Sequence, residues 1–244
     1  MTEEIKKLKE LIDGTDNIVF FGGAGVSTES GIPDFRSVDG LYNQQYDYPP
    51  EEILSHRFFL QHTAEFYTFY RKKILLCEHP FTPRPNAAHN KLAALEQAGK
   101  LRAVITQNID GLHQQAGSRH VLELHGSVER NYCMQCGKDY TADFIRSSTD
   151  IPRCSCGGII KPDVVLYEES LDSRIIEQSI SALQQADLLI IGGTSLNVYP
   201  AAGFLGYSRG NASVLINCGA TQMDNRVDLL IRDKIGAVLH QIKC

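Results

Sequence analysis

The stretch that decides the fold lies near the N-terminus and reads Asn17-Ile18-Val19-Phe20-Phe21-Gly22-Gly23-Ala24-Gly25-Val26-Ser27. Its short apolar run has no polar alternation, which is typical of a strand buried on both faces of a parallel sheet. The glycines that follow would let the backbone approach a pyrophosphate group, whose charge is favoured by free N–H groups and a helix N-terminus. A tight strand-to-helix turn also needs glycine for its dihedral angles, so this motif alone leaves a purely structural explanation equally open.

Similar apolar runs recur along the chain at 103–106, 188–191 and 214–217, and each ends in a polar or glycine-rich turn. Apolar residues at helical spacing lie before and between these runs, at 2–13, 86–99 and 173–186. Strands separated by helices in this order predict a Rossmann-like α/β fold, with a parallel sheet and helices on both faces. Ligands bind such sheets at the carboxyl ends of the strands, where these polar turns would lie.

Two stretches interrupt this alternation and are interpreted as insertions that form a smaller module over the sheet. One joins a Tyr- and Pro-rich loop to a long, aromatic-rich helical segment at 58–76, and the other contains a cluster of cysteines. The predicted organisation is a Rossmann-like domain made of 1–38, 86–127 and 162–244, a helical insertion at 39–85, and a zinc-ribbon insertion at 128–161.

Four of the seven cysteines are closely spaced, with seventeen residues between the two pairs: Cys133, Cys136, Cys154 and Cys156. Two pairs of thiols at this spacing predict a zinc site. Four thiolates would close the coordination sphere and leave no position for a reactive water, so we expect one structural zinc ion per chain.

Composition excludes several classes of protein. The chain has 244 residues, of which 43% are hydrophobic, so it can build a sizeable core. Its net charge of −5 gives no general attraction to nucleic acid, and no direct nucleic-acid partner is expected. The sequence shows neither a signal-peptide pattern nor an apolar run of membrane-spanning length, which predicts a soluble cytoplasmic protein with no membrane partner.

Polar motifs follow the first two predicted strands. Gly31-Ile32-Pro33-Asp34-Phe35-Arg36 places an aromatic ring and a permanent cation just after the glycine loop. Thr106-Gln107-Asn108-Ile109-Asp110-Gly111-Leu112-His113 closes the second strand with amide and carboxylate groups. The dehydrogenase fingerprint is incomplete, because Thr28 fills the third glycine position, so ordinary hydride transfer is disfavoured.

Together with the His125-Gly126 pair, the four cysteines and Gly193-Thr194-Ser195, these motifs make the chain resemble the sirtuins, the NAD-dependent protein deacylases. The resemblance runs from about residue 18 to residue 238. It implies that the acyl oxygen of an acyl-lysine attacks C1′ of the nicotinamide ribose as nicotinamide leaves. His125 would then act as general base on a ribose hydroxyl, since the unperturbed pKa of histidine lies near neutrality.

The resemblance also implies roles for other residues. The residues implied in catalysis are His125, Asn108, Asp110 and Arg36. The loop residues implied in NAD binding are Ala24, Gly25, Ser27, Thr28, Phe35 and Arg36. The later strands would add Gln107, Asn108, Ile109, Asp110, His125, Thr194, Ser195 and Asn217, with Ile235 near the adenine by the position of the final strand.

In sirtuins an acyl-lysine peptide lies as an extra strand between two backbone segments, which implies that acetylated proteins or peptides are the partners here. The matching substrate residues are Val164, Val165, Leu166, Tyr167, Asn197, Val198 and Tyr199, with Phe35. Relatives that favour succinyl-lysine carry a tyrosine and, three residues on, an arginine. This chain has Tyr67 and Tyr70 at these places, and Arg71 is one residue off, so neutral acyl groups are expected.

The sequence departs from the family pattern in three further places, one of which is Gly22, where threonine is common in relatives. The second cysteine pair is Cys-x-Cys where Cys-x-x-Cys is usual, and Glu168 stands where many relatives have glycine. A protein ADP-ribosyltransferase, or a noncatalytic NAD-sensing zinc-ribbon module, are the alternative functions.

Overall fold

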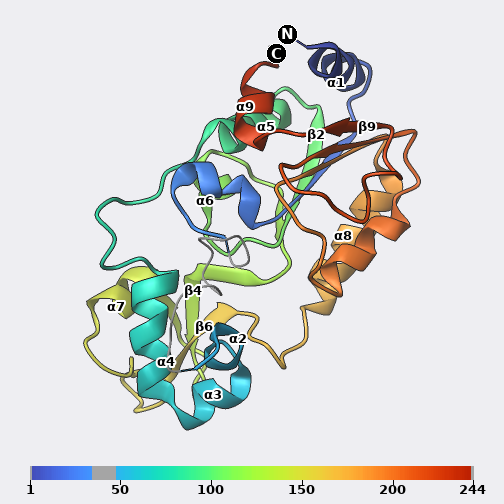
Figure 1. Ribbon diagram of the computed structural model, residues 1–244. Helices are drawn as coiled ribbons and strands as arrows, with labels where there is room; N and C mark the ends of the chain where they lie inside the picture. The colour runs from blue at the N-terminus through green and yellow to red at the C-terminus, as the bar shows by residue number, and fades with distance from the viewer. Residues whose placement is uncertain (1, 35–47, 243–244) are drawn as a thin grey trace.

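The computed structural model describes residues 2–34 and 48–242 (Figure 1). Its larger sheet contains six strands in the order β3-β2-β1-β7-β8-β9, and every neighbouring pair is parallel. The strands are β1 Ile18–Gly22, β2 Leu101–Thr106, β3 Val121–Glu123, β7 Leu188–Gly192, β8 Ala212–Ile216 and β9 Leu229–Ile231. The predicted parallel sheet is confirmed.

Alternate residues of the central strand face two separate cores, because successive side chains of a strand point to opposite faces. Ile18 and Phe20 belong to one core, and Val19 and Phe21 belong to the other. The first core is completed by α1 Glu3–Asp13, α5 Ala87–Gln97 and α9 Ile235–His240, and the second by α8 Ser173–Gln185 and the 3₁₀ helix η5 Ala201–Tyr207. Helices therefore cover both faces of the sheet, as predicted.

The two interrupting stretches pack together into a second module, drawn below the large sheet in Figure 1. Its sheet is antiparallel, in the order β5-β4-β6. The strands are β4 Gly126–Cys133, β5 Asp139–Thr141 and β6 Ile160–Val164, and the helices are α2 Pro50–Ile53, α3 His56–Gln61, α4 Thr63–Phe69, the π-helix η4 Tyr70–Ile74 and α7 Ala142–Ser147. One hydrophobic cluster takes Phe59 and Phe66 from the helical stretch and Ile145 and Ile160 from the cysteine-containing stretch.

The helical stretch is not the continuous helix that was expected at 58–76. It is interrupted at His62, whose backbone dihedral angles of −130° and 49° lie outside the helical region. Within the described residues, no helix is long and apolar enough to cross a membrane.

Candidate active site at the switch point of the sheet

Two glycine turns meet where the strand order reverses, between β1 and β7. The N–H of Gly25 donates to the carbonyl of Gly193 at 2.8 Å, and a Cβ on Gly25 would lie 2.8 Å from that oxygen. Gly193 has φ +59°, and a Cβ there would lie 2.4 Å from the nitrogen of Val26. Both positions therefore require glycine. The turns lie at the carboxyl ends of the strands, where doubly wound sheets bind nucleotides.

The loop after β1 forms two 3₁₀ turns, η1 Ala24–Val26 and η2 Thr28–Ser30, which bring Ser27 to the polar residues after β2. The hydroxyl of Ser27 donates to Oδ2 of Asp110 at 2.6 Å and accepts from Nδ2 of Asn108 at 3.0 Å. Burial raises the pKa of Asp110, while the hydrogen bonds from Ser27 and from the N–H of Leu112 oppose this effect. The structure thus brings together three of the predicted site residues.

His125 lies on the connection between β3 and β4, and its Nδ1 is 2.9 Å from the carbonyl oxygen of Gln107. A carbonyl can only accept, so Nδ1 carries the hydrogen and the lone pair of the neutral ring is on Nε2. Burial lowers the pKa of His125, and the hydrogen bond to Gln107 partly opposes this shift. The hydrogen bond selects the tautomer, and the lowered pKa favours a neutral imidazole that can accept a proton at Nε2.

Gln107 connects His125 to both glycine turns. Its N–H donates to the carbonyl of Gly22 at 3.0 Å, and its Nε2 donates to Oγ1 of Thr194 at 3.1 Å. Thr194 also accepts from the N–H of Leu196 at 3.2 Å. The predicted residues after β1, β2 and β7 are therefore linked by hydrogen bonds.

Thr28, Asn217 and Ile235 are further predicted cofactor residues, which lie on the loop after β1, after β8 and at the start of α9. Thr28 donates to the carbonyl of Gly25 at 3.0 Å, and Asn217, which follows β8, donates to the carbonyl of Gly219 at 2.8 Å. Ile235 begins α9, shortly after the final strand β9, and its place near the adenine stays a prediction. Ile235 is buried, and its side chain packs against Gly192 at the carboxyl end of β7.

Ala24 and Ile109 are partly buried, and Ser195 is exposed beside Thr194. The predicted residues Phe35 and Arg36 lie outside the described residues.

One of the two predicted substrate segments contacts the site directly. The N–H of Val165 donates to the carbonyl of His125 at 3.0 Å, directly after Val164 ends β6. Leu166 is buried and Tyr167 is exposed. The other segment, Asn197, Val198 and Tyr199, follows Thr194 on the loop after β7, and the side chain of Tyr199 is exposed.

Glu168 has φ +76°, in the left-handed region that favours glycine. Its carboxylate accepts from the N–H of Arg57 at 3.1 Å and pairs with the guanidinium of Arg57 at 3.1 Å. The departure from the family pattern thus keeps the backbone conformation of a glycine, and its charge is paired with Arg57.

Tyr67 and Tyr70 lie inside the module, 0% and 1% exposed. The hydroxyl of Tyr67 donates to the carbonyl of Ile160, and the ring of Tyr70 stacks on Phe66 with centroids 5.4 Å apart. The guanidinium of Arg71 lies over the ring of Tyr67, 5.3 Å from its centroid, and donates to the carbonyl of Ile145 at 3.1 Å and to the hydroxyl of Ser148 at 2.7 Å. Their assignment to an acyl pocket stays a prediction.

The four clustered cysteines bring their sulfurs within 4.8 Å of one another. The Sγ atoms of Cys133 and Cys156 are 3.5 Å apart, and those of Cys136 and Cys154 are 3.6 Å apart. Tetrahedral zinc with bonds of about 2.3 Å needs sulfurs about 3.8 Å apart, so this donor set fits one ion. The shortened Cys-x-Cys spacing still lets all four thiols converge.

Sequence reasoning missed one side chain that shapes the cofactor loop. Nδ2 of Asn86 donates to the carbonyl of Val26 at 2.7 Å and to the hydroxyl of Ser30 at 2.9 Å. Asn86 also caps α5. An asparagine before a helix is a recognisable capping signal, but its bonds to a loop some sixty residues earlier leave no local pattern.

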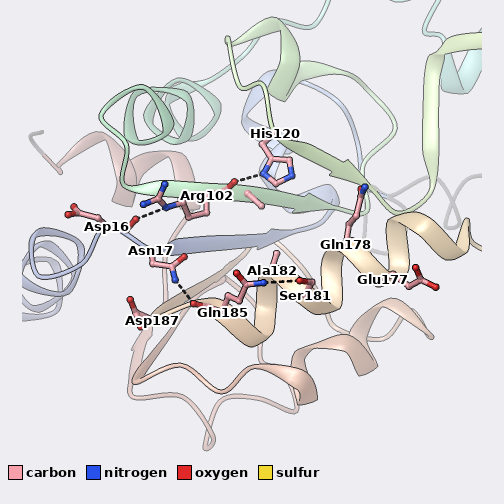
Figure 2. A pocket seen from close by; sticks show the side chains of 11 residues that line it. Asp16, Asn17, Arg102, His120, Glu177, Gln178, Ser181, Ala182, Gln185 and Asp187 are labelled. Carbon is pink, nitrogen blue, oxygen red and sulfur yellow. Dashed lines mark hydrogen bonds between the residues drawn. The ribbon is translucent and has the colours of Figure 1, made fainter.

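A separate hollow of about 850 Å³ lies at the amino ends of β1, β2 and β7, the opposite end from the glycine turns (Figure 2). Arg102 and His120 line one side, and Gln178 and Gln185 of α8 line the other. Nε of Arg102 donates to the carbonyl of Asp16 at 2.9 Å. The hollow contains none of the predicted site residues.

Comparisons with known proteins point to one family. A sequence profile described as the Sir2 family matches residues 23–200. The chain is 56% identical, over 99% of both chains, to proteins named NAD-dependent protein deacetylase from Clostridium acetobutylicum and Clostridium perfringens.

Two solved structures are similar as well. The first, described as "Structural Basis for the Mechanism and Regulation of Sir2 Enzymes", superposes on this chain with a TM-score of 0.87 at 40% identity. The match covers 99% of this chain and 97% of that one. "Sir2-p53 peptide-NAD+" superposes with a TM-score of 0.85 at 38% identity, with the same coverage.

Proposed function

The chain belongs to the Sir2 family and is an NAD-dependent protein deacetylase, and from this premise we propose how its residues carry out the reaction. The observation that carries the proposal is the hydrogen bond from Nδ1 of His125 to the carbonyl of Gln107. It leaves Nε2 as the proton acceptor, in a site that also holds Ser27, Asn108 and Asp110.

His125 is proposed to be the general base. When bound, NAD supplies an electrophilic ribose carbon whose bond to nicotinamide breaks as the acetyl oxygen of the substrate attacks. Nε2 of His125 takes a proton from a ribose hydroxyl, and the carbonyl of Gln107 stabilises the resulting imidazolium by accepting from Nδ1. Because burial keeps the free imidazole neutral, the base is available at neutral pH without prior loss of a proton.

Asp110 and Asn108 are proposed to position the nicotinamide half of NAD. The Asp110 carboxylate is held by the hydroxyl of Ser27 and the N–H of Leu112. A buried carboxylate held in this way can accept from the N–H₂ of a carboxamide. The two glycine turns would lie along the pyrophosphate, with Thr194 and Asn217 toward the adenosine half.

The substrate is proposed to be an acetyl-lysine in an extended peptide, which binds along Val164, Val165, Leu166 and Tyr167 on one side and Asn197, Val198 and Tyr199 on the other. Main-chain pairing of this kind gives affinity with little demand on sequence. The four thiolates would hold a structural zinc ion and require a reducing compartment, for which we propose the cytoplasm.

Mass spectrometry of the products tests this function. Incubation with NAD and an acetyl-lysine peptide should give free lysine peptide, nicotinamide and acetylated ADP-ribose. A peptide that gains ADP-ribose would identify a transferase instead, and absence of NAD turnover would identify a binding module.

A further inference from the structure

Strand β6 carries a buried lysine, Lys161, whose side chain is 5% exposed. Its ammonium donates to the carbonyls of Pro162 at 3.2 Å and Val164 at 3.0 Å, and to Oε2 of Glu169 at 3.0 Å. An ammonium group has three N–H donors, so all of them have acceptors. This buried charge is therefore paired and fully hydrogen-bonded, the condition under which proteins tolerate one.

Glu169 is the centre of the arrangement. Its Oε2 also accepts from the N–H of Leu166 at 2.9 Å, and its Oε1 accepts from Nδ1 of His56 at 2.7 Å. Burial would raise the pKa of Glu169, but the N–H of Leu166, the imidazole of His56 and the ammonium of Lys161 lower it overall. The carboxylate therefore stays charged while it bridges β6, the turn after it, and the start of α3.

These contacts fix the backbone of the proposed peptide-binding segment. The ammonium of Lys161 holds the carbonyl of Val164, and Glu169 holds the N–H of Leu166. The N–H of Tyr167 donates to the carbonyl of Leu54 at 3.0 Å, and the carbonyl of Tyr167 accepts from the N–H of His56 at 2.9 Å.

The same segment is joined to the proposed catalytic residue, because the N–H of Val165 donates to the carbonyl of His125. A shift of this backbone would therefore move a bound peptide relative to His125.

Folding stability alone does not account for the buried ion pair of Lys161 and Glu169. A buried ion pair contributes little net stability, since apolar residues of similar volume often replace one without loss. We propose that Lys161 and Glu169 are positioning residues for the acetyl-lysine peptide, which hold the backbone at Val164 and Leu166 in the geometry that pairs with the substrate. This proposal rests on the proposed deacetylase function and adds to it two residues that act through the peptide-binding backbone.

The variant Glu169→Gln tests the proposal while keeping the size of the side chain. The dissociation constant of a fluorescent acetyl-lysine peptide, and KM for the peptide, should rise about tenfold, because small displacements of a binding backbone weaken pairing strongly. At saturating peptide, kcat should fall as well, because the shifted backbone moves the peptide relative to His125, whereas KM for NAD should stay within about a factor of two. Unchanged peptide affinity in the variant would overturn the proposal, whereas a wild-type protein that removes no acetyl groups would contradict the proposed function instead.

A double variant tests whether Lys161 and Glu169 position the peptide-binding backbone or only neutralise each other's charge. Lys161→Met with Glu169→Met removes both charges, so no buried charge is left unpaired and the fold should survive. Peptide affinity should stay weak, because the contacts to Val164 and Leu166 are lost. Full recovery of peptide affinity would mean that the two charges only offset one another, and would overturn the proposal.

Glu168→Gln is the matched control for these variants, since the neighbouring carboxylate is 42% exposed and pairs only with Arg57 among the described residues. Its peptide affinity should stay within about a factor of two of wild type, as expected for an exposed ion pair. If the double variant unfolds, Glu169→Gln decides alone.

Discussion

The proton on Nδ1 of His125 is the residue-scale feature on which the chemistry depends. Histidine can lose or gain a proton at either nitrogen, and the hydrogen bond to the Gln107 carbonyl selects one tautomer. His120 provides a useful contrast, since its Nδ1 contacts the carbonyl of Arg102 in the hollow at the other end of the sheet. The same type of contact therefore occurs at two ends of the sheet, and only the one at the carboxyl ends faces the proposed chemistry.

Replacing His125 with alanine should abolish most deacetylation. Loss of a general base typically lowers kcat by about 10²–10⁴-fold. NAD binding measured by calorimetry should persist, because the glycine turns and Asp110 are intact. His120→Ala is the control and should keep its activity. A His125→Ala enzyme that turns over acetyl peptide normally would remove His125 from its role.

The fall of kcat/KM on the acid side of the pH profile should lie at a lower pH than that of an ordinary histidine. Burial lowers the pKa of His125 below the ordinary value of 6.5, and the active form is the deprotonated one. Activity should therefore persist as pH falls through 6.5 and decline only at a lower pH. Measurement of kcat/KM for an acetyl peptide across this range checks the sign, and a limb centred above 6.5 would contradict it.

At the scale of single elements, α4 and the π-helix η4 place two tyrosines in different hydrogen-bonding states. The hydroxyl of Tyr67 donates to the carbonyl of Ile160, whereas the hydroxyl of Tyr70 has no partner among the described residues. Burial raises the pKa of both phenols, so both hydroxyl groups stay neutral. A buried donor without a partner costs free energy that a paired donor does not.

Replacing Tyr67 or Tyr70 with phenylalanine should therefore change the free energy of unfolding in different ways. Tyr70→Phe should leave the free energy of unfolding unchanged or raise it by about 1 kcal/mol, because an unsatisfied hydroxyl is removed. Tyr67→Phe should lower it by about 1 kcal/mol, because the Ile160 carbonyl loses its donor. Urea unfolding of the pair provides the measurement, and equal destabilisation by both substitutions would show that the Tyr70 hydroxyl has a partner.

The same helices predict the choice of acyl group. A succinyl carboxylate in a confined apolar site needs a cation, and Arg71 is already bonded to Ile145 and Ser148. The enzyme should therefore have a higher kcat/KM for acetyl-lysine than for succinyl-lysine peptides. Equal or faster removal of succinyl groups would mean that Arg71 leaves these partners to reach the substrate.

Helices and strands could be predicted where the sequence pattern that indicates them is local. The apolar run at β1 and the glycines after it were readable because a buried parallel strand and its turn leave a continuous signal. The strands β3 and β9 have three residues each, too few to show a period. Contacts such as Asn86 with Val26, or Glu169 with His56, join distant parts of the chain and leave no sequence pattern.

At the scale of the whole molecule, the chain passes from one sheet to the other at His125. β3 is an edge strand of the large sheet and β4 begins the small antiparallel sheet, and His125 lies on the two-residue connection between them. The NAD side of the proposed site is built on the cores of the large sheet, and the peptide side is built on β6 of the module. Catalysis is therefore expected to depend on both the large-sheet domain and the module, although their hydrophobic cores are separate clusters.

Removal of zinc should disturb the module that contains the cysteines more than the domain built on the large sheet. Cys133 and Cys154 belong to the module core, so a strong chelator, or Cys133→Ala, should disrupt β4 and β6 and lower deacetylation at least about tenfold. NAD binding should be weakened less, because the glycine turns rest on the large sheet. Elemental analysis should find one zinc ion per chain before chelation and none after it.

Cys77→Ser is the control, since Cys77 is an exposed cysteine outside the cluster, and it should change neither the zinc content nor the activity. Full peptide deacetylation by metal-free protein would contradict the structural role of the site, because the segment that follows β6 could then hold the peptide without an intact zinc ribbon.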